Sequence, residues 1–133
     1  MIREAVMSER DIGGIQRLVN IGVEKGRIQP RTHDEIVAII EQRHFWVADH
    51  VMGIAGCIAL EVYSPTLAEI RSLVVINERH RELGKDLVAR VVEEARRLGI
   101  RDLLTITDRI GDFELNEFEI LKGQTPMFLR LTD

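Results

Sequence analysis

The chain has 133 residues, of which 45% are hydrophobic and 30% are charged, a composition typical of globular domains. No apolar run approaches the roughly 20 residues of a membrane span, and the charged start has no apolar signal core. The net charge of −4 is unfavourable for nonspecific nucleic-acid binding. The only cysteine, Cys57, excludes an internal disulfide, and the histidines share no metal-like spacing. We therefore expect one cytoplasmic domain over residues 1–133, without a metal, membrane or nucleic-acid partner.

Hydrophobic periodicity divides the chain into strands and amphipathic helices. Thr32 and Glu35 form a capping-box pair, which marks one helix start, and Ser8 or Asp11 is expected to cap another. Gly99 should close the helix with the clearest apolar face. The expected elements are strand 2–6, helix 9–25, helix 33–42, strand 44–49, strand 53–62, strand 68–76, helix 83–98, strand 102–107, helix 108–118 and strand 127–131.

This order, β-α-α-β-β-β-α-β-α-β, predicts an α/β (α+β) fold. Antiparallel strands come first, since 44–49 and 53–62 are joined by a short turn and form a hairpin. A β-α-β unit follows, so the sheet should be mixed but mainly antiparallel, with helices on its faces. Cys57 lies in a small apolar strand and is expected to be a core residue rather than a nucleophile.

The stretch most informative for function is the end of strand 68–76 with the helix start that follows. Free N–H groups at a helix N-terminus attract anions, and Arg79, Arg81 and Lys85 would add charge for a phosphate or pyrophosphate. One alternative is a basic turn that is merely solvated. Another is a general α/β domain that binds a different phosphorylated ligand.

Four groups of residues, in the right order and spacing, resemble the GNAT (Gcn5-related) N-acetyltransferase superfamily. They are Ile2-Arg3-Glu4-Ala5 with Arg10-Asp11-Ile12, the central strand 68–75, the acyl-CoA loop position 79–84 and the late segment 113–118. The resemblance covers nearly the whole chain. It implies a GNAT-like fold, acetyl-CoA as cofactor, and transfer of an acetyl group from a thioester to an amine.

The resemblance also implies where acetyl-CoA would lie. Backbone N–H groups near the end of the central strand would polarise the thioester carbonyl. Of the two glycines in the family's loop only Gly84 remains. Glu82 replaces the other if Arg79 opens the motif, and Asp86 replaces it if Arg81 does; a carboxylate there would repel phosphate. The residues implied to hold the cofactor are Leu73, Val74, Val75, Arg79, His80, Arg81, Leu83, Gly84 and Lys85.

Glu69 occupies a position where the superfamily often places a base, and it would deprotonate the amine through water. The alternative is a structural carboxylate paired with Arg71. The family often has a tyrosine as general acid where Phe113 stands here, so no acid is identified. The alternative to an enzyme is therefore a catalytically silent GNAT-fold module that binds acyl-CoA or serves in assembly.

Within the superfamily, three segments are similar to the acetyltransferase domain of N-acetylglutamate synthases. These segments are 24–36, 56–60 and 130–132. The similarity implies that Arg31, Arg130 and Thr132 bind the carboxylates of glutamate or another amino acid, for which the arginine fork is suited. The alternatives are a surface role for Arg31 and a solvated tail for Arg130. Glu61, near the same place, is unfavourable for glutamate. The implied partners are a small amine or amino acid and, by analogy, a second copy in a homodimer.

Overall fold

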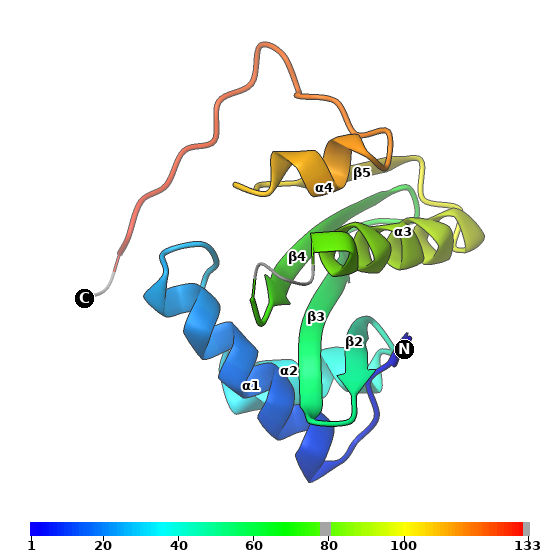
Figure 1. The fold of residues 1–133 in the computed structure, drawn as a ribbon. Coiled ribbons are helices and arrows are strands. Elements are labelled where there is room, and N and C mark those ends of the chain that lie inside the picture. Colours follow the sequence, from blue (N-terminus) through cyan, green and yellow to red (C-terminus); the bar gives the residue numbers. More distant parts are fainter. Residues whose placement is uncertain (78–80, 132–133) are drawn as a thin grey trace.

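The structure, a computed structural model, describes residues 1–77 and 81–131, without the side chain of Arg81. In this part of the chain, five strands form one sheet in the order β1-β2-β3-β4-β5 (Figure 1). The elements are β1 (Ile2–Glu4), α1 (Glu9–Glu24), α2 (His33–Glu41), β2 (Phe45–His50), β3 (Gly53–Val62), β4 (Leu67–Val75), α3 (Arg81–Arg97), β5 (Asp102–Thr105) and α4 (Ile110–Glu114). None of the described helices is long and apolar enough to span a membrane.

The sheet is mixed and mainly antiparallel, as the sequence predicts. β1 with β2, β2 with β3, and β3 with β4 are antiparallel pairs. β4 and β5 are parallel, because α3 connects them as a crossover. The sheet therefore has its single parallel pair at the edge formed by β5.

Two apolar clusters lie on opposite faces of the sheet. Successive side chains in a strand point to opposite faces, so Phe45 and Val47 of β2 pack with α1 and α2, while Trp46 between them packs with α3 and α4. Figure 1 shows the same division, with α1 and α2 on one side and α3 and α4 on the other. Cys57 is fully buried in the first cluster, as expected.

The helix starts follow the predicted caps. The Ser8 side chain accepts a hydrogen bond from the Asp11 N–H, so Ser8 rather than Asp11 is the N-cap of α1. At α2, Thr32 and Glu35 form both hydrogen bonds of the capping box. These local signals are satisfied within the first turn, which is why the sequence alone could place them.

The expected last strand, 127–131, is wrong. These residues are described, and they adopt neither helix nor strand. Figure 1 shows this part of the chain as an extended tail. Its apolar residues are typical of a short strand, but Met127 and Leu129 are 92% and 79% exposed. A strand needs a partner to satisfy its backbone hydrogen bonds, and apolar side chains do not supply one.

The expected helix 108–118 is also shorter, since only Ile110–Glu114 is helical. Glu117 adopts a left-handed backbone with φ 71°, which an α-helix does not tolerate. The Phe118 N–H then donates to the Phe113 carbonyl and closes the helix end. Phe113 and Phe118 pack edge to face, with ring centres 5.1 Å apart.

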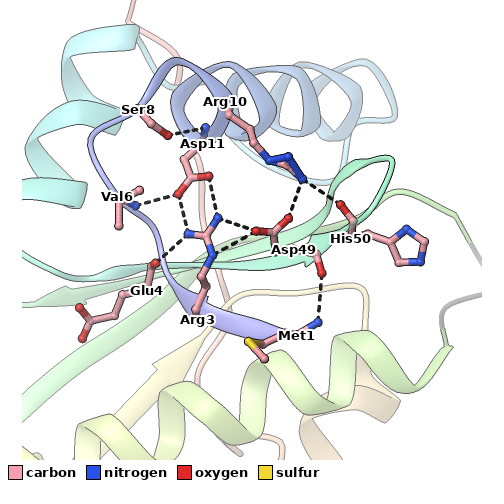
Figure 2. Close-up of polar contacts among 9 residues, drawn as sticks. All are labelled: Met1, Arg3, Glu4, Val6, Ser8, Arg10, Asp11, Asp49 and His50. Atoms are coloured by element: carbon pink, nitrogen blue, oxygen red, sulfur yellow. Dashed lines mark hydrogen bonds and ion pairs between the residues drawn. The ribbon is translucent and has the colours of Figure 1, made fainter.

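An ion-pair network ties β1 to the start of α1 and to the end of β2 (Figure 2). Arg3 contacts Asp11 at 2.7 Å and Asp49 at 2.8 Å, and Arg10 contacts Asp49 at 2.6 Å. Asp11 is buried and also accepts the Val6 N–H at 2.8 Å. Burial alone would raise the pKa of Asp11, but the hydrogen bonds from Arg3 and Val6 hold it below its ordinary value. The network therefore gives Arg3, Arg10 and Asp11 of the opening segment a structural role.

Asp11→Asn should lower the free energy of unfolding by about 3 kcal/mol, because it removes the buried charge that pairs with Arg3 and leaves Asp49 as the described ion-pair partner of Arg3. Urea denaturation would measure the loss. Arg10→Gln removes the exposed outer arm of the same network and is the matched control, for which a much smaller loss is expected. Equal losses in the two variants would contradict the central role of Asp11.

Candidate functional site

The candidate site is a cleft at the point where β4 and β5 separate. Their parallel pairing ends at Ile70 and Thr105. β5 ends at Thr105 whereas β4 continues to Val75, and residues 71–75 and 106–109 line the cleft. The end of α1 and the residues after it form a further wall, which brings Lys25 and Arg27 to the cleft. Residues 106–107, expected to continue the strand, therefore belong to the cleft instead.

A bulge in β4 shapes this cleft. Cys57 pairs with Val74 and Ala59 pairs with Arg71, so two residues of β4 lie opposite the single residue between them on β3. Ser72, in this bulge, has a left-handed φ of 57°, which is uncommon for a residue other than glycine. The bulge interrupts regular pairing at the start of the cleft wall, so it re-aims the backbone there.

Two side chains from other elements hold the bulge in place. Arg31 Nε donates to Ser72 Oγ at 2.7 Å, and Cys57 Sγ donates to the Ser72 carbonyl at 3.4 Å. Burial raises the pKa of the Cys57 thiol to about 12. Cys57 is therefore a structural thiol that is protonated at neutral pH, in agreement with the core role that the sequence predicts.

Arg31 and Arg71 converge on one carboxylate beside the cleft. Arg31 Nη2 donates to Glu61 Oε1 at 2.6 Å, and Arg71 Nη1 lies 3.3 Å from Glu61 Oε2. The Arg31 side chain is only 6% exposed and Glu61 is 23% exposed. Burial would raise the pKa of Glu61, but the two guanidinium groups hold it below its ordinary value. The alternative prediction, in which Arg31 is an exposed surface residue, is therefore wrong.

The same cluster contains the candidate base. The Tyr63 hydroxyl donates a short hydrogen bond to Glu69 Oε1, and its oxygen also lies 3.2 Å from Glu61 Oε2. Glu61 and Glu69 are cross-strand partners, so their side chains leave the same face of the sheet. Burial and the bond to Glu69 raise the pKa of Tyr63, which keeps the phenol protonated at neutral pH. Arg71, the partner expected for Glu69 in the structural alternative, instead makes its ion pair with Glu61.

Some of the residues predicted to hold a cofactor line the cleft and others do not. Leu73, Val74 and Val75 line it. Leu83 is half-buried and packs into the apolar cluster around α3. Lys85 lies in the early part of α3, where its amine pairs with Glu82 at 2.8 Å. Three predicted cofactor positions lie outside what the structure describes, namely Arg79, His80 and the side chain of Arg81.

Gly84 has a packing role that the sequence does not reveal. A Cβ at this position would overlap Asp112 and would lie 2.6 Å from Arg109 Nη2. Arg109 and Asp112 form an ion pair of 2.6 Å between the N-cap and the first turn of α4. Gly84 therefore lets α3 approach α4 closely, in addition to any role in cofactor binding.

The predicted carboxylate clamp is only partly described. Arg31 lies in the cluster beside the cleft. Arg130 lies in the exposed tail, where its guanidinium is 5.3 Å from the centre of the Phe128 ring. Thr132 is outside the described residues.

Sequence reasoning missed Ser72 and Tyr63. No sequence signal marks the left-handed Ser72, whereas the cross-strand spacing of Glu61, Tyr63 and Glu69 around one turn could have suggested their contact.

No protein-family model matches the chain. An uncharacterized N-acetyltransferase of Chlorobaculum tepidum is 31% identical over 105 residues, which cover 78% of this chain and 66% of the relative. The amino-acid acetyltransferase of Aeromonas salmonicida is 33% identical over 116 residues, which cover 82% of this chain and 26% of the relative. The chain thus spans just under two thirds of the first relative and about a quarter of the second.

Solved structures have the same fold. Rv2747 from Mycobacterium tuberculosis, in complex with CoA, matches with a TM-score of 0.81 at 24% identity, over 96% of this chain and 76% of that one. N-acetylglutamate synthase from Neisseria gonorrhoeae, complexed with coenzyme A and N-acetyl-glutamate, matches with a TM-score of 0.74 at 24% identity, over 88% of this chain and 27% of that one. The chain therefore has the GNAT fold. Its sequence relatives are N-acetyltransferases and amino-acid acetyltransferases, which confirms the resemblance predicted from the motifs.

Gly84→Ala should destabilise the protein by about 1–3 kcal/mol, because the added Cβ displaces the Arg109–Asp112 pair. Gly13→Ala in α1 is the matched control, since nothing lies within 4 Å of its added Cβ. That change should stabilise the protein by about 0.5–1 kcal/mol, the usual gain for alanine over glycine in a helix. Urea unfolding measures both effects, and equal gains would contradict the packing role of Gly84.

Proposed function

We propose that the protein is an acetyl-CoA-dependent N-acetyltransferase that acts on a small amine. The observation that carries the proposal is the cleft between the separated ends of β4 and β5, with the β4 bulge on its wall. The names of the sequence relatives supply the reaction class, acetyl transfer to an amine.

The described residues fit an extended thioester cofactor. From residue 71 to residue 75, β4 pairs with β3 on one side and lines the cleft on the other, so it can offer backbone amides to a ligand. Lys25, Arg27 and Arg109 also line the cleft. Lys85 adds a cation in α3, whose N-terminal end favours anions such as phosphates. We assign cofactor binding to these cleft residues and to the start of α3.

When bound, acetyl-CoA supplies the acetyl group as a thioester, and transfer forms the amide C–N bond, breaks the C–S bond and releases CoA as the thiol. The task of the chain is to hold the amine beside the thioester and to remove a proton from it. We assign proton removal to Glu69, whose Oε1 is oriented by Tyr63. The N–H groups of residues 73–75 are proposed to polarise the carbonyl. No described residue is assigned as the acid that protonates the thiolate.

The finer proposal concerns the acceptor. Amino acids are the first acceptors to test, because several relatives are named amino-acid acetyltransferases. N-acetylglutamate synthase from Neisseria gonorrhoeae, with N-acetyl-glutamate bound, adds glutamate to that set. The α-amine would be the reacting group. Arg31, the residue predicted to bind a carboxylate of the acceptor, contacts Ser72 of the cleft wall, so its environment bears on which acceptors fit.

Acetyl-CoA should bind in the micromolar range, and Lys85→Glu should weaken binding roughly tenfold if the phosphates lie near the start of α3. Arg96→Glu is the matched control, because it makes the same charge change at the far end of the same helix on a side chain that is 72% exposed. Calorimetric titration measures the dissociation constants, and thermal unfolding verifies that both variants are folded.

The outcomes separate the alternatives. Equal weakening in both variants would indicate a general charge effect and contradict the assigned phosphate position. Binding without acetyl transfer to any amine would support a silent acyl-CoA-binding module. No binding at millimolar acetyl-CoA would overturn the proposed function.

Glu69→Gln should lower kcat/KM for the amine roughly 100-fold and leave the affinity for acetyl-CoA unchanged, because only proton removal is lost. Release of the CoA thiol can be followed with a thiol reagent, since the buried Cys57 thiol has a pKa raised to about 12 and should not react in the folded protein. Tyr63→Phe is the control that keeps the carboxylate and removes one hydrogen bond, so a smaller loss is expected. Full activity of Glu69→Gln would exclude Glu69 as the base.

A further inference from the structure

The cluster beside the cleft already contains its own carboxylate. Glu61 binds the Arg31 guanidinium at 2.6 Å, and among the described residues the guanidinium also donates a 2.7 Å hydrogen bond to Ser72. With 6% of its side chain exposed, Arg31 has almost no surface left for a ligand. A carboxylate of an acceptor would have to displace Glu61 before it could make the two-pronged contact that arginine favours.

The second arginine shares the carboxylate of Glu61. Arg71 Nη1 lies 3.4 Å from Glu61 Oε1 and 3.3 Å from Glu61 Oε2, so it shares the same carboxylate. Glu69 adds another carboxylate to the same sheet face, held by Tyr63. The two arginines are therefore balanced by two glutamates, and an incoming dicarboxylate would bring further negative charge next to both.

We propose that Glu61 is a specificity-determining residue. The acceptor is then an amine that places no carboxylate at Arg31, and the end of the acceptor away from the reacting amine is neutral or cationic. This inference rests on the proposed acetyltransferase function and narrows its acceptor. Glutamate, although bound as its acetylated form in a structural neighbour, is a poor acceptor for this chain. Glu61 fills the carboxylate position from within, so Arg31 holds the β4 bulge and does not grip the substrate.

The test compares glutamate with its diamide, glutamine amide, which has the same shape but no carboxylate. In the wild type, kcat/KM should favour the diamide. In Glu61→Gln, which leaves Arg31 uncompensated, the ratio of kcat/KM for glutamate to that for the diamide should rise roughly tenfold or more, the worth of one charge-assisted hydrogen bond. Glu61→Asp keeps the charge and should retain the wild-type preference.

A binding measurement makes the test independent of turnover. Glutarate, a plain dicarboxylate, should bind Glu61→Gln at least tenfold more tightly than the wild type in calorimetry. The gain should disappear in the double variant Glu61→Gln with Arg31→Gln. If Glu61→Gln alone proves too unstable to assay, the wild-type preference for the diamide over glutamate still tests the inference.

The outcomes distinguish this inference from the proposed function. If the wild type prefers glutamate to the diamide, or if a folded Glu61→Gln variant shows neither a changed ratio nor tighter glutarate binding, the role of Glu61 is overturned while acetyl transfer stands. If no amine is acetylated but glutarate binding responds to Glu61→Gln, the proposed function fails and the charge role of Glu61 stands.

Discussion

The bulge at Ser72 is the constraint on which the candidate site depends. A regular β4 would continue straight along β3, whereas the extra residue turns the strand where its pairing with β5 ends. A serine with φ 57° is costly in isolation. It persists because Arg31 binds its hydroxyl and Cys57 binds its carbonyl. The cleft therefore depends on contacts from the residue before the α2 cap and from the middle of β3, neither of which lines the cleft itself.

This arrangement gives Arg31 two roles that truncation of its side chain cannot separate. It hydrogen-bonds the bulge through Nε and neutralises Glu61 through Nη2. Removing the whole side chain would loosen the cleft wall and leave a partly buried carboxylate without its main partner. Loss of activity on truncation of Arg31 would therefore say little about substrate contact. Substitution of Glu61 is more informative, because Glu61 can be neutralised while Arg31 still donates its hydrogen bond to Ser72.

Local signals made most of the fold predictable, and non-local contacts explain what was missed. The caps at Ser8 and Thr32 act within one helical turn, so the sequence contains all that they require. The prediction of a strand at 127–131 was wrong because strand pairing depends on a distant partner and not on local apolar residues alone. In the site, motif similarity located the cleft wall at 73–75. It could not reveal that Arg31 is already bound by Glu61, since that contact joins residues 30 positions apart.

The first turn of α3 shows that a departure from a family motif has to be judged by the contacts of the replaced residue. In the sequence, Glu82 in place of a glycine suggests repulsion of phosphate. In the structure its carboxylate lies 2.8 Å from Lys85 Nζ, and this pair lowers the pKa of Glu82 and raises that of Lys85. The two charges largely cancel at this exposed site, so an approaching anion meets the helix N-terminus and a lysine that can exchange one anionic partner for another. Gly84 meanwhile is required for contact with α4. The glycine kept in this motif therefore reports on helix packing as much as on anion binding. The loss of the other glycine is compatible with a cofactor held mainly by the backbone of β4.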